Sequence, residues 1–481
     1  MSFCAATTSG PKPSSGFDMM RKRTSGNQQK ISPGRLFAYE ALLKLNAPGS
    51  KFHSDSLLRT RALDKLAPVD RNLATTLVLG TLRWQLALDA LIRPLLTRPN
   101  AKLDAEVLTA LRLAAFQLTH LDRIPAHAAI NESVALTHAS GHKFAAGMVN
   151  AVLRKLAANA AESRALAPRD AYPEWLVGRW TNNFGGAITD AICLHGQQQP
   201  GLNLRLIAPD AESTLLAAGA ELAPGSLLTT ARRLINGSLP EAPESSFRIQ
   251  DEGSQLVAEI AAALLPADAS PQPRLLDACA APGGKTLLLA ERLPLAAITA
   301  MENSPPRLAE LRQRMASHPR PLSSRISCEE ADATEPFATL NLDLVLADVP
   351  CTGTGTLGRN PEIRHRLTPA SLAAHAARQQ KILSNALHAL RPGGRLLYST
   401  CSLEPEENQL AIDAALKSCP AEFMQLTLAP ALDSLATSGL LHAHALPQLK
   451  AALTPAGALP LLPGQFNSDG FFICALERRV Q

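Results

Sequence analysis

Apolar residues recur every three or four positions along residues 33–156, which is the spacing that places them on one face of an α-helix. Continuous apolar faces of this kind run through residues 36–43, 73–91 and 107–118. Short breaks containing Pro, Gly or Asn separate these segments, as turns between packed helices do. The pattern predicts a compact all-α domain in the first third of the chain.

The pattern changes after residue 249, where short apolar runs alternate with longer helical segments. This alternation is typical of a doubly wound, Rossmann-like α/β domain with a parallel sheet. The predicted strands occupy residues 274–278, 297–301, 325–328, 342–347 and 394–399. Two later runs, at residues 422–428 and 470–476, predict an antiparallel hairpin at the edge of the sheet.

The segment between these two patterns is mixed. Residues 201–207 form an apolar run that predicts a strand, within a small α+β connector. The chain is therefore expected to be multidomain. The predicted parts are a tail at residues 1–31, a helical domain at 32–160, the connector at 168–248 and the α/β domain at 249–481.

Composition narrows the class of protein. With 481 residues, 46% of them hydrophobic, the chain can form several sizeable cores. No apolar run approaches the roughly 18 residues of a membrane span, so no membrane association is expected. The first 31 residues are polar and basic without an apolar stretch, which predicts a disordered tail and no secretory signal. The eight cysteines include no C-x-x-C pair, so no metal site is expected and the thiols are predicted to stay reduced in the cytoplasm.

Charge is distributed unevenly along the chain. Residues 1–166 contain 22 lysines and arginines against 11 aspartates and glutamates, a net charge of +11. The remaining residues contain 25 against 31, a net charge of −6. A basic front part predicts a module that binds a polyanion such as a nucleic acid. The alternative is a helical bundle with a solvated basic surface.

The stretch R-L-L-D-A-C-A-A-P-G-G-K-T at residues 274–286 combines a predicted strand, a tight turn and the start of a helix. In an α/β sheet this arrangement presents backbone N–H groups to a ligand at the carboxyl end of the strand. A P-loop is excluded because Cys279 stands five residues before Gly284, where that motif requires Gly. The dinucleotide motif G-x-G-x-x-G is also absent. The stretch predicts a ligand loop of another kind, with an ordinary turn as the alternative.

Acidic residues stand at or just beyond the ends of the first four predicted strands. Glu302 lies 25 residues beyond Asp277, close to the spacing of about 20 at which a carboxylate meets a ribose hydroxyl pair. Asp332 and Asp348 follow the next two strands. Together these residues predict a pocket for a nucleoside cofactor. Because the loop lacks the glycines that a pyrophosphate needs, S-adenosylmethionine fits better than a dinucleotide.

Two cysteines follow the fourth and fifth predicted strands, Cys351 in D-V-P-C-T-G and Cys401 in S-T-C-S-L. A lone Cys is usually a small core residue, but two at neighbouring strand ends beside a cofactor pocket predict chemistry. A partly ionised thiol can add to an unsaturated carbon. Addition at C6 of cytosine would make C5 nucleophilic enough to accept a methyl group. A second thiol could help to end that reaction.

Motifs along the chain carry a resemblance. The C-terminal half contains D-A-C-A-A-P-G-G-K-T, A-D-V-P-C-T-G-T-G, N-P-E-I-R, L-R-P-G-G-R-L-L-Y-S-T-C-S-L-E-P-E-E-N and D-G-F-F-I, and the N-terminal part contains V-D-R-N-L-A-T-T-L-V-L-G-T-L-R-W and N-A-V-L-R-K-L. Together they resemble the bacterial 16S rRNA cytosine-C5 methyltransferase family with a NusB-like RNA-binding N-terminal domain. The resemblance covers nearly the whole chain from about residue 33.

The resemblance implies an S-adenosylmethionine-dependent enzyme that methylates carbon 5 of a specific cytosine in 16S rRNA, naked or in an early small-subunit particle. It implies that Cys401 attacks C6, that Cys351 assists product release, and that Lys285 and Asp348 hold the target cytosine. The implied cofactor-binding residues are Cys279, Ala280, Ala281, Pro282, Gly283, Gly284, Lys285, Glu302, Asp332 and Asp348. The candidate RNA contacts, each of which could instead lie on a solvated face, are Arg71, Arg83, Arg154 and Lys155.

Two residues depart from the family pattern, since Glu302 stands where Asp is usual and Val349 where a smaller Ala is usual. Neither change removes a needed functional group. In DNA cytosine methyltransferases a Glu-Asn-Val motif follows the Pro-Cys, whereas Glu302-Asn303 precedes it here, so no DNA substrate is expected. The alternatives are a non-catalytic RNA-binding or ribosome-assembly factor and a cytosine-C5 methyltransferase acting on another RNA. The protein is expected to be a monomer.

Overall fold

The computed structural model describes residues 31–159, 166–240, 242–243, 245–336, 341–418 and 422–480. The predicted tail therefore lies outside the described residues, apart from Ile31. The chain divides into two compact units, Met1–Arg179 and Trp180–Gln481. None of the described helices is long and apolar enough to cross a membrane.

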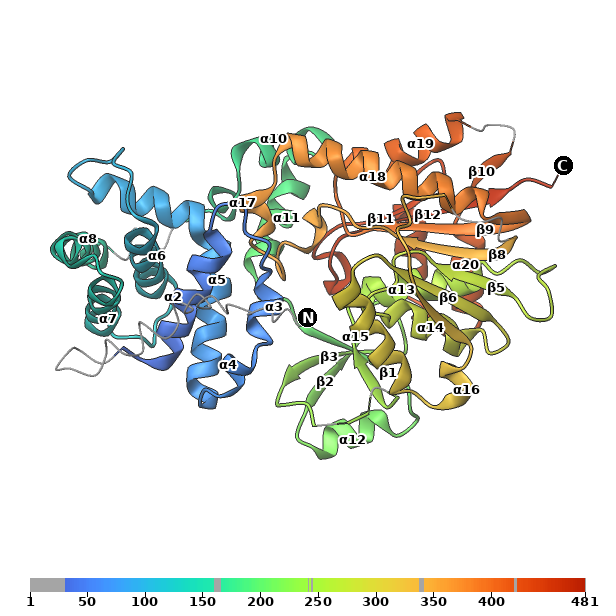
Figure 1. The fold of residues 1–481 in the computed structure, drawn as a ribbon, viewed down its shortest axis with the longest axis horizontal. Coiled ribbons are helices and arrows are strands. Elements are labelled where there is room, and N and C mark those ends of the chain that lie inside the picture. Colours follow the sequence, from blue (N-terminus) through green and yellow to red (C-terminus); the bar gives the residue numbers. More distant parts are fainter. Residues whose placement is uncertain are drawn as a thin grey trace, which may run out of the picture. The chain divides into compact units, whose positions relative to one another are not determined.

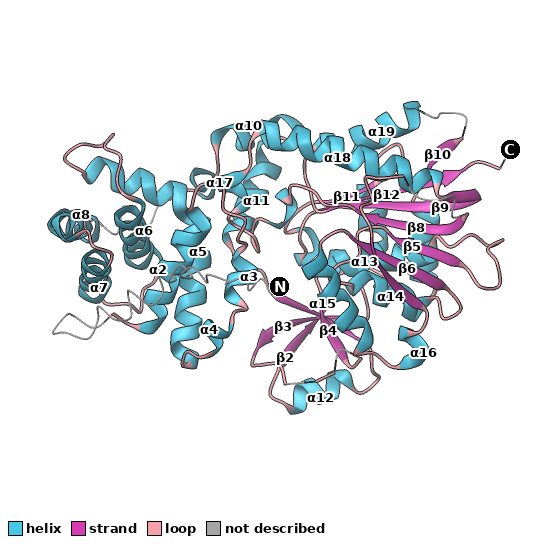
Figure 2. Cartoon of the chain, viewed as in Figure 1, coloured by secondary structure: helices cyan, strands magenta, loops and turns pink. Residues whose placement is uncertain are grey.

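The first unit is helical, as the period of its apolar residues predicts (Figures 1 and 2). Its core includes the buried side chains of Leu42, Leu77, Leu111, Leu136 and Leu153, each from a different helix. Full burial of such a side chain contributes about 1.5–3 kcal/mol, so this shared core holds the helices together. The helices are α2 (Pro33–Asn46), α3 (Ser54–Leu58), α4 (Arg61–Asp64), α5 (Pro68–Ile92), α6 (Ala105–His120), α7 (Ala126–Ala139) and α8 (Ala146–Ala158), with 3-10 turns η1 (Arg93–Leu95), η2 (Lys143–Ala145) and η3 (Pro168–Ala171).

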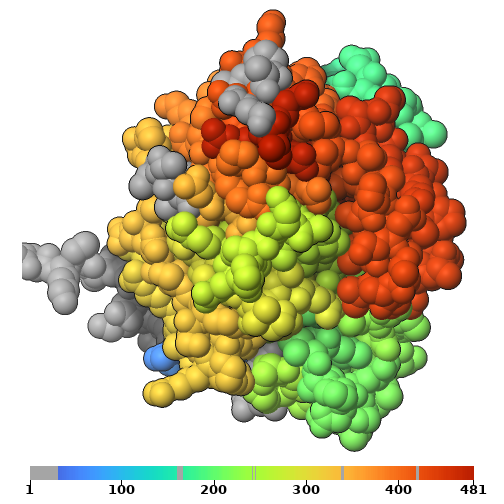
Figure 3. All heavy atoms as spheres, turned by 90° about the vertical axis from the view of Figure 1, so that its right-hand side faces the viewer, coloured from blue at the N-terminus to red at the C-terminus, as the bar shows by residue number. Residues whose placement is uncertain are grey.

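The second unit begins inside α10 (Glu174–Phe184), continues through α11 (Gly186–Gln197) and contains a small antiparallel sheet ordered β2-β3-β1-β4. Leu228, which follows β2, forms an isolated β-bridge with Leu441, and Thr229 Oγ1 donates to Gly439 O (2.9 Å). The green surface of this region accordingly adjoins the orange-red surface of the C-terminal segment (Figure 3). The elements of the small sheet are β1 (Leu202–Leu206), α12 (Ala211–Ala217), β2 (Glu221–Pro224), β3 (Ala231–Asn236) and β4 (Phe247–Ile249).

The main sheet of the second unit has the strand order β10-β12-β9-β8-β5-β6-β7, with β11 paired to β12. The five strands from β7 to β9 run parallel, and β12 runs antiparallel to β9. The carboxyl ends of the parallel strands therefore meet at one edge. The strands are β5 (Arg274–Asp277), β6 (Ala297–Glu302), β7 (Ile326–Glu330), β8 (Leu342–Asp348), β9 (Leu390–Thr400), β10 (Phe423–Leu426), β11 (Leu459–Leu461) and β12 (Phe471–Arg478).

Helices cover both faces of the main sheet (Figure 2). Alternate side chains of one strand point to opposite faces, so Leu344 and Leu346 of β8 join one core and Val345 joins the other. Residues of α13, α14 and α20 complete the first core, and residues of α18 and α19 the second. The helical elements are α13 (Glu252–Ala263), α14 (Gly284–Arg292), α15 (Pro305–Ala316), α16 (Arg320–Ser323), α17 (Ile363–Arg366), α18 (Pro369–His388), α19 (Gln409–Ser418), α20 (Ala429–Thr437), α21 (Ala445–Ala452), η4 (Thr354–Thr356), η5 (Pro405–Glu407) and η6 (Gln465–Asn467).

The sheet differs from its sequence prediction at one edge. The two runs predicted as a hairpin do pair antiparallel, as β10 and β12, but α20, α21 and β11 lie between them in the chain. The prediction of a simple edge hairpin is therefore wrong, because β12 is an interior strand between β9 and β10. Its burial on both faces accounts for the continuous apolar run F-F-I-C-A-L.

Candidate active site

The loop between β5 and α14 is shaped by a buried carboxylate and a glycine. Asp277 ends β5, and burial raises the pKa of its carboxyl to about 6, while a hydrogen bond from Thr286 Oγ1 (2.7 Å) acts in the opposite direction. Gly283 has a φ of +96°, and a Cβ at this position would lie 2.5 Å from Met315 Cε. The turn therefore requires Gly, which lets the start of α14 pack closely against α15.

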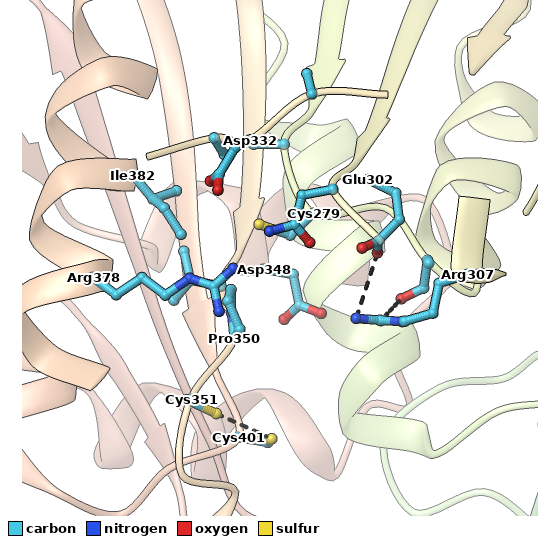
Figure 4. A pocket seen from close by; sticks show the side chains of 16 residues that line it. Cys279, Glu302, Arg307, Asp332, Asp348, Pro350, Cys351, Arg378, Ile382 and Cys401 are labelled. Carbon is cyan, nitrogen blue, oxygen red and sulfur yellow. Dashed lines mark hydrogen bonds and ion pairs between the residues drawn. The ribbon is translucent and has the colours of Figure 1, made fainter. Parts of the chain in front are cut away.

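This loop borders a cavity of about 260 Å³ at the carboxyl edge of the main sheet (Figure 4). Arg378 and Ile382 of α18 lie on one side of the cavity, and Glu302 and Arg307 lie on the other. Of the sequence-predicted residues, those that line it are Cys279, Ala281, Glu302, Asp332, Asp348, Cys351 and Cys401. Residues from five strand ends, distant in sequence, thus meet at one cavity.

A second cavity of about 110 Å³ borders the same loop. The predicted residues that line it are Asp277, Cys279, Ala280, Ala281, Pro282, Gly284, Lys285 and Asp348. Cys279, Ala281 and Asp348 thus border both cavities. Gly283 lines neither cavity, and a Cβ added there would meet Leu311 and Met315 of α15. Apart from Gly283, the predicted site residues from 277 to 401 therefore line two cavities that share three residues.

Two acidic side chains, Glu302 and Asp332, lie at the end of the larger cavity opposite Cys351 and Cys401 (Figure 4). Glu302 is buried, accepts a hydrogen bond from Ser304 N (2.9 Å) and lies 3.4 Å from Arg307 Nη1. Asp332 is exposed, and hydrogen bonds from the backbone and hydroxyl of Thr334 hold the pKa of its carboxyl below the usual value. Both groups are therefore acceptors, suited to hydroxyl or amino donors of a ligand.

Lys285, which lines the smaller cavity, forms an ion pair with Asp348, which borders both cavities. Lys285 Nζ lies 2.6 Å from Asp348 Oδ2, and Ser399 Oγ donates to Asp348 Oδ1 (2.7 Å). Burial lowers the pKa of Lys285, but the charge of Asp348 and the hydrogen bond to it outweigh burial, so the pKa lies above its usual value. The pair therefore presents a fixed cation and a fixed carboxylate.

Cys351 and Cys401 are in contact, with their sulfur atoms 3.3 Å apart (Figure 4). The hydrogen bond with Cys401 and burial together raise the pKa of the Cys351 thiol well above its usual value. Burial also raises the pKa of Cys279, which favours its neutral thiol. Both thiols of the contacting pair border the cavity, so a substrate atom can reach them.

Sequence reasoning missed several residues of this site. Asn303, which follows Glu302 directly, and Arg307, in the first turn of α15, line the larger cavity, and their closeness to the end of β6 was a usable signal. Arg378 and Ile382 reach it from the middle of α18, where no motif marks them. Only the tertiary packing of α18 places these two side chains at the cavity.

The four arginine and lysine residues predicted to contact RNA lie in the first unit. Arg154 and Lys155 of α8 are exposed, and Arg154 Nε donates to Asn150 Oδ1 (3.2 Å). Arg71 is partly buried and donates to the backbone oxygen of Asp64 (3.1 Å). Arg83 is only 6% exposed, which leaves its guanidinium little surface to offer a phosphate. The pair on α8 is therefore the better placed of the four.

Comparison with known proteins identifies the family. Residues 262–477 match the family described as 16S rRNA methyltransferase RsmB/F, and residues 32–158 match the NusB family. The chain is 30% identical to the probable ribosomal RNA small subunit methyltransferase B of Bacillus subtilis over 463 residues, or 92% of this chain and 98% of the relative. The chain belongs to the 16S rRNA methyltransferase RsmB/F family. Members of this family depend on S-adenosylmethionine and act on RNA, so the predicted cofactor and the RNA substrate are confirmed.

Other relatives agree with this family. The ribosomal RNA small subunit methyltransferase B of Pseudomonas putida is 32% identical over 430 residues, covering 86% of this chain and 92% of the relative. The crystal structure of PH0851 is similar in fold, with a TM-score of 0.70 at 21% identity, covering 94% of this chain and all of that one. The structure of NSun6 from Pyrococcus horikoshii with SFG has a TM-score of 0.51 at 16% identity, covering 64% and 99% of the two chains. The predicted fold classes, a helical NusB region and a Rossmann-like methyltransferase domain, are confirmed.

Gly355 offers a test of how tightly the site is packed. Its N–H donates to Cys401 O (2.9 Å), and an added Cβ would lie 2.5 Å from Gly470 O and 2.9 Å from Cys401 O. Gly355→Ala is expected to displace the Cys401 backbone, to destabilise the protein by about 1–3 kcal/mol and to lower methyl transfer at least about tenfold. Denaturant unfolding and initial rates measure these effects. Gly147→Ala in α8, where the Cβ meets nothing within 4 Å, is the control. Equal rates for the two variants would contradict the prediction.

Proposed function

We propose that this RsmB/F-family protein methylates carbon 5 of a specific cytosine in 16S rRNA through a covalent bond between Cys401 and C6 of the base. The observation that carries this proposal is the contact between two cysteine sulfurs, 3.3 Å apart, beside the Lys285–Asp348 pair. An enzyme that methylated an exocyclic amine would need no nucleophile, whereas C5 chemistry needs one. The paired thiols therefore favour C5.

Cys401 begins the reaction in this proposal. Its thiolate adds to C6, and the electron pair of the C5–C6 double bond moves into the ring toward N3 and O2. Lys285 and Asp348 hold the base, and the Lys285 cation stabilises the negative charge that develops on it, since a fixed cation needs no reorganisation during the step. C5 becomes an enamine carbon and takes the methyl group.

Release of the product reverses the addition. The C5 proton leaves to a base, the C5–C6 double bond forms again, and the electron pair of the C6–sulfur bond returns to Cys401 as a thiolate. Cys351 lies 3.3 Å away and is held as a thiol by its raised pKa. Its S–H can therefore donate a hydrogen bond to the departing thiolate, which is how we propose that it assists release.

The larger cavity fits S-adenosylmethionine by the chemistry of its walls. Glu302 offers acceptors for a ribose hydroxyl pair, Asp332 an acceptor for an amino group, and Pro350 and Ile382 apolar surface for a purine. When bound, S-adenosylmethionine supplies an electrophilic methyl group. The loop from Cys279 to Lys285 and Asp348 would enclose the rest of the cofactor. These residue assignments are part of the proposal.

The first unit is proposed to contribute RNA binding. Arg154→Ala combined with Lys155→Ala is expected to weaken binding of 16S rRNA fragments and to lower the slope of log K against log salt by roughly 1.4–1.8, because two phosphate contacts are lost. Filter binding over a range of salt concentrations measures the slope. The matched control is Lys51→Ala with Arg59→Ala, two exposed cations of the same unit. An unchanged slope, or an equal loss in the control, would place the RNA contacts elsewhere.

We infer that unmodified 16S rRNA, naked or partly assembled, is methylated by a monomer in the cytoplasm and that DNA is not a substrate. The domain boundaries at residues 31, 160, 168 and 248 belong to the same proposal. The competing candidate is a non-catalytic assembly factor of the same fold. Incubation with a labelled methyl donor separates them, because methylation of 16S rRNA but not of DNA is expected, and a binding factor would give no incorporation at any enzyme concentration.

A further inference from the structure

Glu407 joins the two loops that carry the cysteines. It ends η5 and is fully buried. From the Cys351 loop, Thr352 donates its backbone N–H to Glu407 Oε1 (2.9 Å) and its hydroxyl to Oε2. From the Cys401 loop, the Ser402 hydroxyl also donates to Oε2. The residue that follows each cysteine therefore donates to the same carboxylate.

A second set of contacts fixes Glu407 itself. Gln379 Nε2 of α18 donates to Glu407 Oε1 (2.9 Å) and also to Pro350 O (3.0 Å), directly before Cys351. Tyr398 of β9 donates its hydroxyl to the backbone oxygen of Glu407 (2.7 Å). The carboxylate thus accepts hydrogen bonds from an amide N–H, two hydroxyls and a side-chain amide. Buried carboxylates are tolerated when donors converge on them in this way, and such networks hold their members rigidly.

We propose that Glu407 is a positioning residue that sets the contact between the sulfurs of Cys351 and Cys401 and holds Cys351 as the hydrogen-bond donor of that contact. The proposal rests on the proposed roles of the two cysteines. Each loop is tied to the carboxylate one residue from its sulfur, so little freedom remains to change the distance between the sulfurs. The negative charge also opposes ionisation of Cys351, and it adds to the effects of the Cys401 hydrogen bond and of burial in raising the pKa of that thiol. Cys351 is thereby kept as the hydrogen-bond donor that product release needs.

Other charged groups surround the pair as well. Arg378 borders the same cavity from α18, and Asp348 ends β8 beside its partner Lys285 of α14. Tyr398 of β9 is buried, and burial raises the pKa of its hydroxyl well above the usual value. The Tyr398 hydroxyl bonds the backbone oxygen of Glu407 and not its carboxylate. Removing the charge of Glu407 while keeping its shape is therefore the cleanest perturbation.

Glu407→Gln tests the proposal. One amide oxygen can still accept from Thr352 N and Gln379, and the hydroxyls of Thr352 and Ser402 can turn to accept from the new N–H₂ group. The kcat is expected to fall at least about tenfold, while KM for RNA and for S-adenosylmethionine stays unchanged. Alkylation of Cys351 by iodoacetamide, followed by peptide mass spectrometry at a fixed pH below its pKa, should become roughly tenfold faster, since loss of the negative charge lowers the pKa of the thiol and leaves more of it ionised.

Two further variants separate this role from a general loss of stability. Glu252→Gln is the matched control, because Glu252 is also a buried carboxylate, bonded by the backbone N–H groups of Ser226, Leu227 and Leu228. It should lower stability without changing kcat or alkylation. Thr352→Val keeps the charge of Glu407 and removes one tie, so it should lower kcat without speeding alkylation. Thr352→Val also decides the positioning role should Glu407→Gln fail to fold.

Unchanged kcat in Thr352→Val, or unchanged kcat or alkylation in folded Glu407→Gln, would overturn the proposal. The alkylation experiment uses the resting enzyme without RNA, so it reports on Glu407 independently of the reaction. Failure of the proposed function would instead appear as methylation that survives in Cys401→Ala.

Discussion

Replacing Cys401 with alanine is expected to lower cytosine methylation by a factor on the order of 10⁴ or more, the scale seen when a nucleophile is removed. Without addition of a thiolate at C6, C5 of cytosine does not become an enamine carbon and has no electron pair to offer a methyl group. Initial rates of methyl transfer into unmodified 16S rRNA measure the effect. A denaturing gel should show no covalent complex between this variant and RNA.

A matched variant controls for general effects of losing a thiol. Cys328 is a free cysteine in β7 and is absent from the residues that border the two cavities beside the loop. Cys328→Ala is expected to keep the rate of the unsubstituted enzyme. Retention of more than about one hundredth of the rate by Cys401→Ala would show that another group attacks the base. A covalent complex formed by Cys401→Ala would exchange the roles of the two cysteines.

Replacing Cys351 with alanine is expected to have a different result, in which enzyme and RNA remain joined. Cys401 still adds to C6 and C5 is still methylated, but the departing thiolate loses the hydrogen bond from the neighbouring S–H, 3.3 Å away. Elimination then becomes slow, and turnover should fall at least about a hundredfold. A slowly migrating RNA–protein band on a denaturing gel, sensitive to protease, measures the trapped complex.

The double variant provides the control for this trap. With Cys351 and Cys401 both replaced by alanine, no complex should form, because the trapped bond is assigned to Cys401. A complex in the double variant would mean that the bond involves another residue. Normal release by Cys351→Ala alone would show that the second thiol is dispensable, and the sulfur contact would then have only a structural role.

Much of the site could be predicted because its residues stand at strand ends. Asp277, Glu302 and Asp348 end their strands, and Asp332 lies two residues beyond its strand, so the rule that parallel strands meet at one edge is enough to bring them together. The motifs around Cys351 and Cys401 follow the same rule. The helical first unit was equally predictable, since its core depends on a periodic pattern that the sequence displays directly.

What could not be predicted depends on packing between distant segments. Arg378 lies on one turn of a long helix, and its approach to the cavity depends on how α18 crosses the sheet. The partners of Glu407 come from the loop after β8, the loop after β9 and α18, and no spacing in the chain relates them. Arg83 belongs to a motif with an RNA-binding resemblance, yet its position on the inner side of α5 buries it. Apart from the shared edge of the parallel strands, sequence spacing determines neighbours within one element and not the contacts between elements.

The chemical identity of the methylated nucleoside tests C5 chemistry most directly. Unmodified 16S rRNA is incubated with the enzyme and a labelled methyl donor, digested to nucleosides and separated by liquid chromatography with mass spectrometry. The expected result is label in 5-methylcytidine. Mapping of RNA fragments from the same reaction should trace that label to a single cytosine. Label in a nucleoside methylated on an exocyclic nitrogen or on ribose, or no label in 16S rRNA, would contradict the proposed function.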